Sequence, residues 1–383
     1  MSEWFFWGSF VLLGHHYVFY PIIVLLLSKL AMKSTSGTLP QDGKLPRVSL
    51  VIAAYNEEKV IGRKLENSLG LDYPVKLLEV IVVSDGSSDN TSSIVEQYRD
   101  CGVISLHDPE RRGKTAALNR GVAESQGEIV LFSDANNDFN LFAIRALVRN
   151  FADPDVGGVC GVKRIRDARE RESSVGDSLY WRYESAIKLA ESRLGSITNG
   201  DGEIFAIRRE LYEPMDETVI NDDAELTLKI VQKGFRVLYE PGAESSEFAS
   251  IDIRDDFFVK VRMVAGGFQT ISRHAAFLLP PRNCFTGAFF SHKILRWTSP
   301  IWLMTLLIST AQLIQHSFYM LLLIAQIILY GLGAIGWAMR KHGKLPTIIY
   351  VPFYFCTMNV AAFFGMMRHF RRGQNVQWRK AQR

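Results

Sequence analysis

The chain has little cysteine, with four residues in 383, and none of them is spaced as CxxC or CxxH. This scarcity excludes a zinc site built on closely spaced thiolates and a disulfide-stapled scaffold, and it predicts free thiols in a reducing compartment. Internal repeats and low-complexity tracts are also lacking. The formal net charge is only +4, and the basic residues cluster beside apolar runs. We therefore expect them to face phospholipid headgroups, and the sequence indicates no nucleic-acid partner.

Apolar residues are abundant at both ends of the chain. Residues 4–30 form an apolar run that is interrupted only by His15 and His16, and the run is long enough to span a bilayer. No basic segment precedes it and no small-residue cleavage site follows it, which favours a retained helix over a signal peptide. Nearly all the neighbouring charge, including Lys29 and Arg47, follows the run. By the positive-inside rule, the amino terminus lies outside and the middle of the chain is cytosolic.

The carboxyl end predicts three more membrane spans, at 298–314, 317–339 and 345–367. Four spans in total would place the tail outside, yet its six basic residues after position 367 predict that it lies inside. Two alternatives stay open. Either one carboxyl-terminal segment is re-entrant, or two of the spans are wrongly divided.

The middle of the chain alternates between short apolar runs and segments with helical spacing. The apolar runs at 48–54, 78–83, 103–106 and 128–132 are typical of buried strands, and helices are expected at 59–69, 91–98 and 115–125. This rhythm predicts an α/β domain with a doubly wound, mostly parallel sheet, whose ligands bind at the carboxyl ends of the strands. Asp85 and Asp134 follow two of these strands, so both should line one crevice. A divalent cation between such carboxylates and a diphosphate would remove the repulsion of like charges.

The resulting division has five regions, and a linker at 34–44 connects the first of them to the second. The regions are an amino-terminal transmembrane helix (1–33), the α/β domain (46–250), amphipathic helices on the membrane surface (251–297), carboxyl-terminal transmembrane helices (298–367) and a basic tail (368–383).

Six short motifs occur in a characteristic order within this domain. They are VIAAYNEE (51–58), VSDGSSDNT (83–91), RGKTAALN (112–119), FSDAN (132–136), GEIFAIRR (202–209) and NDDAEL (221–226). Together they resemble glycosyltransferase family 2, the family of cellulose, chitin, hyaluronan and poly-N-acetylglucosamine synthases, over about residues 47–267. The resemblance implies a cytosolic domain of GT-A type and a nucleotide-sugar donor.

The resemblance also implies roles for the donor-binding residues. Those expected to contact the nucleobase, the ribose or the diphosphate are Ala54, Tyr55, Glu57, Asp85, Gly113 and Lys114. Asp134 and Asn136 occupy the position of the metal-binding DXD motif, so Mg²⁺ or Mn²⁺ is the implied cofactor. Asn136 departs from the motif, although its amide oxygen can still bind a metal.

For the transfer step, Asp222 and Asp223 stand where the family has an acidic pair that opens a helix. An acceptor hydroxyl must lose its proton as it attacks, so the alignment makes Asp223 the general base, and Asp222 would orient it. Arg262 matches the Arg of the family's QxxRW motif, which would place it near the diphosphate. Val259 and Met263 stand where the Gln and the sugar-stacking Trp would be.

These features predict an integral protein of a bacterial inner membrane with a cytosolic catalytic domain. Its expected activity is that of an inverting hexosyltransferase, which moves a sugar from a donor such as a UDP-sugar to a lipid-linked or saccharide acceptor. That activity belongs to envelope or exopolysaccharide synthesis, where polysaccharide-assembly proteins would be partners. Two alternatives remain: a processive polysaccharide synthase that also translocates its product, and a non-catalytic scaffold that binds nucleotide sugars.

Overall fold

The computed structural model describes residues 1–31, 45–166, 173–248, 253–340 and 345–371. The predicted linker and most of the predicted basic tail lie outside these ranges. The strands are β1 Val48–Ala54, β2 Leu78–Asp85, β3 Val103–Asp108, β4 Ile129–Asp134, β5 Asp138–Phe139, β6 Val156–Arg166, β7 Phe205–Arg208 and β8 Arg236–Phe248.

The helices of the amino-terminal segment and the α/β domain are α1 Ser2–Gly14, α2 Tyr20–Leu30, α3 Ile61–Leu69, α4 Thr91–Glu96, α5 Lys114–Glu124, α6 Ala143–Val148, α7 Ser173–Leu194 and α8 Asp222–Gln232. Those that follow are α9 Ile253–Arg273, α10 Ala275–Leu278, α11 Cys284–Phe289, α12 Leu295–Gln312, α13 Ser317–Met339 and α14 Thr347–Phe370. A π-helical turn, η1 His15–Phe19, joins α1 to α2, and a second, η7 Phe290–Ile294, joins α11 to α12.

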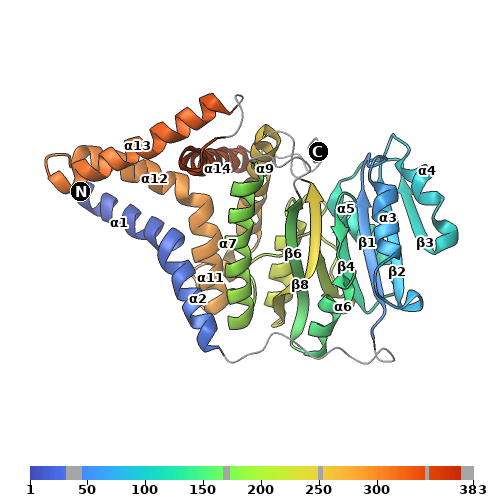
Figure 1. Cartoon of the computed structure of the whole chain (residues 1–383). Helices are drawn as coiled ribbons and strands as arrows, with labels where there is room; N and C mark the ends of the chain where they lie inside the picture. Colours follow the sequence, from blue (N-terminus) through green and yellow to red (C-terminus); the bar gives the residue numbers. More distant parts are fainter. Residues whose placement is uncertain (32–44, 167–172, 249–252, 341–344, 372–383) are drawn as a thin grey trace.

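The strands form one eight-stranded sheet in the order β3-β2-β1-β4-β7-β6-β8-β5. β1 to β4 pair in parallel, which confirms the alternating α/β pattern in the first half of the domain. In the second half, β7 pairs antiparallel with both β4 and β6, and β5 pairs antiparallel with β8. The sequence pattern did not predict this mixed half, which lies next to the membrane-associated helices (Figure 1).

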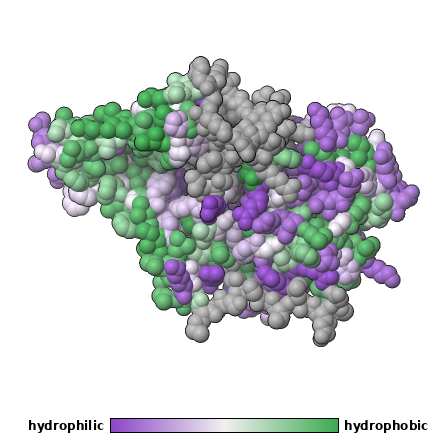
Figure 2. Space-filling view, in the orientation of Figure 1, coloured by the Kyte–Doolittle hydropathy of each residue, from purple (hydrophilic) through white to green (hydrophobic). Residues whose placement is uncertain are grey.

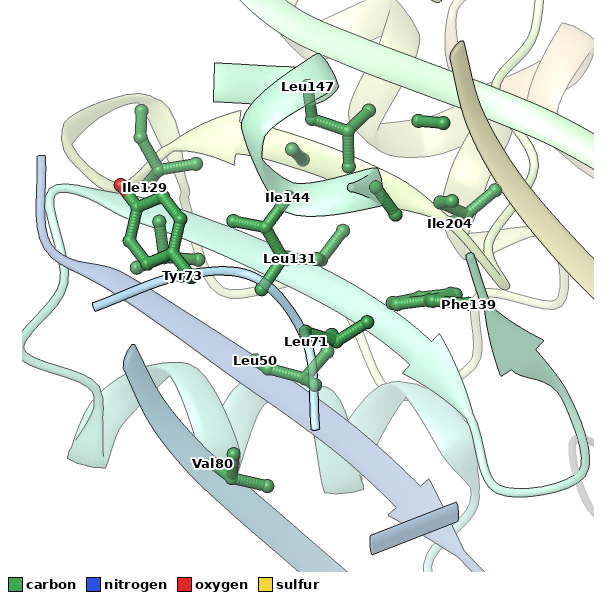
Figure 3. Packing of buried hydrophobic residues seen from close by; sticks show 14 of the residues in the cluster. Leu50, Leu71, Tyr73, Val80, Ile129, Leu131, Phe139, Ile144, Leu147 and Ile204 are labelled. Atoms are coloured by element: carbon green, nitrogen blue, oxygen red, sulfur yellow. The ribbon is translucent and has the colours of Figure 1, made fainter. Parts of the chain in front are cut away.

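Two apolar layers enclose the sheet. On one face, Leu50 and Leu131 pack with Ile144 and Leu147 of α6 (Figure 3). On the other face, α5 and α8 pack against β1, β4 and β7, for example through Leu118. Every residue of β1 is buried, because helices cover both faces of this strand. That is why its sequence is almost uniformly apolar rather than alternating.

Three helical stretches of the described residues are long and apolar enough to cross a membrane: Ser2–Leu30, Ser317–Met339 and Thr347–Phe370. Apolar side chains cover the surface formed by α1, α12 and α13, whereas polar side chains dominate around β1 to β3 (Figure 2). This distribution is typical of a polar domain attached to a membrane-embedded helical unit.

The predicted span at 298–314 is not among these candidates. It corresponds to α12, whose 18 residues include Arg296, Ser299 and Gln312. α12 packs against α1, with a hydrogen bond of 2.6 Å from Ser2 Oγ to Gln312 Oε1 at one end and one of 3.4 Å from Tyr17 to Ser299 farther along. By length and composition, two of the described carboxyl-terminal helices are candidate spans, compared with the three that were predicted. A total of three spans would agree with a basic tail on the inner side.

A buried polar network joins the α/β domain to the apolar helices, and its centre is Glu184 of α7. The Glu184 carboxylate accepts hydrogen bonds from Lys293 at 2.7 Å and Arg296 at 2.9 Å, and it lies 3.3 Å from His292 Nε2. Burial alone would raise the pKa of Glu184 and favour its neutral form. These three basic groups nevertheless hold the pKa of Glu184 well below its usual range.

Glu191, two turns farther along α7, extends the network to the amino-terminal helix. Its carboxylate accepts a hydrogen bond of 2.6 Å from Tyr20 and lies 2.8 Å from His292 Nδ1. It also accepts hydrogen bonds from the backbone and side chain of Thr198, each at 3.1 Å. One helix of the α/β domain therefore holds both α2 and the start of the carboxyl-terminal helical unit.

We predict that Glu184→Gln destabilises the folded protein by roughly 3–5 kcal/mol, because the buried cations Lys293 and Arg296 lose their counter-charge. Thermal unfolding in detergent, followed by tryptophan fluorescence, measures the effect as a lower midpoint. Glu244→Gln is the matched control. Its partner Arg164 is half exposed, so this pair should contribute less than about 1 kcal/mol. Equal midpoints for the two variants would contradict the assigned role of Glu184.

Candidate active site

The carboxyl ends of the parallel strands bring several predicted site residues to one edge of the sheet. Ala54, the last residue of β1, pairs with Ser84 of β2, and Ala53 pairs with Asp134 of β4. Asp85 ends β2 and Asp134 ends β4, so both carboxylates lie at the edge where open α/β sheets bind ligands.

Lys114, the first residue of α5, links this edge to α8. Its ammonium group lies 2.8 Å from the Asp134 carboxylate and 3.4 Å from that of Asp222. Burial disfavours the charged form of Lys114, but the negative charges of Asp134, Asp222 and Asp223 outweigh it and raise the pKa. Lys114 therefore stays protonated, and it joins the predicted metal-binding motif to the predicted catalytic pair.

Asp223 occupies the first turn of α8, where the carboxylate accepts a hydrogen bond of 2.8 Å from the backbone N–H of Ala224. Its second oxygen accepts one of 3.2 Å from Asn199. Burial, with added repulsion from Asp222 and Asp201, raises the pKa of Asp223 to about 6. A carboxylate with this pKa is ionised at neutral pH and is more basic than an ordinary aspartate, as a general base requires.

Gly202 allows the chain to pass very close to this pair. A Cβ atom at this position would lie 3.0 Å from Asp222 Oδ2 and 3.2 Å from Lys114 Nζ. Any larger residue would crowd the ion pair, which explains on steric grounds why the sequence motif has glycine at this position.

Asp85 is buried at the end of β2, and its donor-binding role stays a prediction. Its carboxylate is fully buried and accepts hydrogen bonds from the backbone N–H groups of Arg112 at 3.1 Å and Gly113 at 2.7 Å. It also pairs with the Arg120 guanidinium at 3.0 Å. In this structure, Asp85 fixes the turn that precedes Lys114. Gly113 belongs to that turn and adopts φ 107°, a conformation that favours glycine.

Tyr55 follows β1 and packs against Arg111, whose guanidinium carbon lies 3.6 Å from the centre of the Tyr55 ring. Gly86 makes this approach feasible, because a Cβ atom there would lie 2.7 Å from the Arg111 backbone nitrogen. The sequence analysis did not single out Arg111, since the arginine lies just outside the recognised motif.

The loop that contains Glu57 is tied to the segment after β2. The backbone N–H of Glu57 donates a hydrogen bond of 2.7 Å to the Thr91 hydroxyl. Asn56 has φ 53° in the left-handed region, and its side-chain oxygen accepts a hydrogen bond of 2.8 Å from Ser88 N–H. The two predicted nucleoside-binding motifs therefore form one connected surface.

The predicted metal position consists of Asp134 and Asn136. The Asp134 side chain is 39% exposed, and the Asn136 amide makes no hydrogen bond to any described residue. Among the described residues, no group of three or more His, Cys, Asp or Glu side chains is arranged to hold a metal ion. One carboxylate and one amide fit a cation that takes most of its remaining ligands from phosphate and water, as Mg²⁺ commonly does.

Asn137, which the sequence analysis missed, holds this loop in place. It is fully buried and accepts hydrogen bonds from Lys64 at 2.8 Å and Ser133 at 2.9 Å. Its amide donates to the Glu203 carbonyl and to Ser245, both at 2.8 Å. The hydrogen-bonding capacity of Asn137 is thus fully used by the protein, which leaves Asn136 as the amide that can face a ligand.

Arg262 of α9 supports the loop before α8. Its guanidinium donates a hydrogen bond of 3.3 Å to the Ile220 carbonyl, while Gln269 accepts one of 3.1 Å from Ile220 N–H. Asn221 in turn donates to the Met263 carbonyl at 2.9 Å. Burial lowers the pKa of Arg262, although nearby carboxylates oppose this shift. α9 therefore positions the segment that leads into the predicted catalytic pair.

A separate cavity of about 430 Å³ lies at the opposite, amino-terminal edge of the sheet, beside Pro46, Ile129 and Arg208. None of the predicted site residues lines it, so we do not assign this cavity to the reaction.

Comparisons with known proteins agree with this arrangement. A family model described as glycosyl transferase family 2 matches residues 49–215. The probable glycosyltransferase YdaM of Bacillus subtilis (strain 168) is 32% identical over 213 residues, which cover 52% of this chain and 50% of that protein. The poly-beta-1,6-N-acetyl-D-glucosamine synthase of Staphylococcus aureus (strain COL) is 27% identical over 235 residues, covering 60% and 57%. The chain thus spans only a little over half the length of these relatives.

Among solved structures, the mannosyltransferase PcManGT from Pyrobaculum calidifontis, in complex with GDP-Man and Mn²⁺, is similar with a TM-score of 0.73 at 23% identity. The match covers 98% of this chain and all of that one, so the likeness in fold includes the helices outside the α/β domain. The GT-A-type fold is therefore confirmed, and residues 49–215 of this chain match the model of glycosyl transferase family 2.

Proposed function

We propose that the chain transfers a sugar from a nucleotide-diphosphate sugar to a hydroxyl group of a lipid-linked or saccharide acceptor, with inversion at the anomeric carbon. The observation that carries this proposal is the position of Lys114 between Asp134 and Asp222. It joins a donor site at the end of β4 to a carboxylate pair suited to proton removal.

Asp223 acts as the general base. As the acceptor oxygen attacks, its proton passes to the Asp223 carboxylate while the bond from the anomeric carbon to the diphosphate breaks. A single displacement from the face opposite the leaving group inverts the anomeric centre. Asn199 orients the base through its hydrogen bond of 3.2 Å, and the raised pKa of Asp223 makes the carboxylate a better proton acceptor.

Positive charge near the leaving diphosphate comes from Lys114 and, through α9, from Arg262. The Lys114 ammonium donates to ionised oxygens, and charge-assisted hydrogen bonds of this kind are stronger than neutral ones. Asp134 and Asn136 would hold a divalent cation, which when bound neutralises charge on the diphosphate. The Mn²⁺ in the mannosyltransferase of similar fold supports this assignment.

The contacts between α9 and α14 support an acceptor that reaches the site from the membrane. A Cβ atom at Gly365 of α14 would lie 2.7 Å from the Val261 carbonyl oxygen of α9, so the two helices touch closely. α9 also holds the loop before Asp222 and Asp223. With three membrane spans, the amino terminus would lie outside, and the catalytic domain and the basic tail would lie in the cytosol.

A processive synthase remains the second candidate, because one relative makes poly-beta-1,6-N-acetyl-D-glucosamine. Met263, at the position of the family's sugar-stacking Trp, is 41% exposed on α9. A thioether offers no flat surface for holding a growing chain, which favours single transfer. The length of the product made by purified protein from donor alone distinguishes the two, since a long polymer would contradict single transfer.

We predict that Asp223→Asn lowers kcat by about 10²–10⁴-fold, because the amide cannot accept the acceptor proton. The assay measures nucleotide release from a panel of UDP- and GDP-sugars, with purified protein in detergent and added membrane lipid. Asp153→Asn, at the opposite edge of the sheet and 45% exposed, is the control that should keep wild-type activity. Unchanged turnover in Asp223→Asn would remove this residue from the mechanism.

The reaction rate should depend on pH through Asp223. Since the base works only when deprotonated, kcat/KM should be constant above the pKa of about 6 and fall about tenfold per pH unit below it. A pH series with the best donor of the panel measures this profile. An inflection that survives in Asp223→Asn, or a flat profile across this range, would show that another group controls the rate.

Removal of divalent cations with EDTA should abolish transfer, and Mn²⁺ or Mg²⁺ should restore it. Asn136→Asp should lower the metal concentration needed for half-maximal rate, since it adds a carboxylate ligand, and Asn136→Ala should raise it. Full activity in EDTA, or identical metal dependence of the three proteins, would refute the assignment.

A further inference from the structure

Asp201 lies in a loop that wraps around the first turn of α8. On one side of it, Gly200 N–H donates a hydrogen bond of 3.1 Å to Thr227, whose hydroxyl donates to the Asp223 carbonyl at 2.7 Å. On the other side, Gly202 passes so close to Asp222 that a Cβ atom there would lie 3.0 Å from Asp222 Oδ2. The backbone therefore holds Asp201 beside the proposed base without any contribution from its side chain.

A buried lysine fixes the Asp201 carboxylate in one orientation. Lys188 of α7 is only 3% exposed, and its ammonium group lies 2.7 Å from Asp201 Oδ2. Cys160 of β6 is next to the same oxygen, at 3.8 Å, and its sulfur accepts a hydrogen bond of 3.1 Å from Asp201 N–H. A lysine without its partner would be costly to bury here, so the pair is a fixed element of the site.

The other oxygen of Asp201 remains available. No described residue donates a hydrogen bond to Oδ1, and the side chain is 15% exposed. Its neighbours Gly200 and Gly202 place Asp201 beside the carboxylate pair of α8. A carboxylate oxygen only accepts hydrogen bonds, so whatever binds there must donate one.

We infer that Asp201 is a specificity-determining residue that accepts a hydrogen bond from a sugar hydroxyl of the acceptor, and that Lys188 holds it in position. This inference rests on the proposed function and narrows the acceptor. The nucleophile is an uncharged sugar hydroxyl rather than the phosphate of a lipid phosphate, because Asp201 and Asp223 would repel a phosphate. A lipid-linked sugar and a free saccharide share this chemistry.

The test compares four acceptor probes of three classes, with the donor that gives the highest nucleotide release. They are two alkyl glycosides (octyl β-glucoside and octyl β-N-acetylglucosaminide), a free disaccharide (cellobiose) and a lipid phosphate (farnesyl phosphate). We expect transfer to at least one sugar probe and none to farnesyl phosphate. The octyl glycosides and cellobiose separate a lipid-linked from a free saccharide. Transfer to farnesyl phosphate alone, or to no sugar probe, would overturn the inference. Nucleotide release without any acceptor would still support the proposed function in that case.

In Asp201→Asn, KM for the sugar probe should rise about tenfold or more, while KM for the donor changes less than about twofold. Because this variant leaves Lys188 buried without its partner, the double variant Asp201→Asn with Lys188→Met is measured beside it. The neutral pair should recover the thermal midpoint but keep the raised KM. If the double variant also recovers the acceptor KM, or if neither variant changes it, Asp201 has only a structural role and the inference fails.

Discussion

The position of Lys114 is the constraint on which the rest of the site depends. One ammonium group lies between a carboxylate at the end of β4 and another at the start of α8, two elements separated by about 90 residues of chain. Asp85 fixes the turn before Lys114, and Gly202 leaves room for the ion pair. Without a cation here, the carboxylates of Asp134 and Asp222 would repel each other in a partly buried place.

The same site is tied to the membrane unit by two routes. The first is the network around Glu184, which fixes α7 to the start of α12 and, through Glu191, to α2. The second is α9, which packs against α14 and holds the loop that ends at Asp222. The proposed acceptor side of the site is therefore built from elements that contact the apolar helices, whereas the proposed donor side belongs to the sheet. The predicted donor motifs are short segments at strand ends, but the proposed acceptor contacts join residues that are distant in the sequence.

Much of the parallel half of the fold could be predicted, because buried parallel strands such as β1 are continuous apolar runs with helices between them. β6 and β7 were missed, since their antiparallel pairing depends on distant partners and β6 contains three glycines. α12 was expected to be a span because of its apolar residues, and its polar groups bond to several helices: Arg296 to α7, Ser299 to α14 and Gln312 to α1. The nucleoside-binding role of Asp85 stays a prediction, and its hydrogen bond to the turn before Lys114 was not foreseen. Asp201 and Asn137 carry no local signal, because their roles follow from contacts across the sheet.

The central claim is that Lys114 makes the donor aspartate and the acidic pair one functional unit. A double-mutant cycle tests it directly, with kcat/KM measured for Lys114→Met, Asp222→Asn and the combination of both. Substitutions of two residues that act through one ion pair should have strongly non-additive effects. The loss of kcat/KM in the double variant should therefore be smaller, by about tenfold or more, than the product of the two single losses. Losses that multiply, as expected for independent residues, would contradict the account.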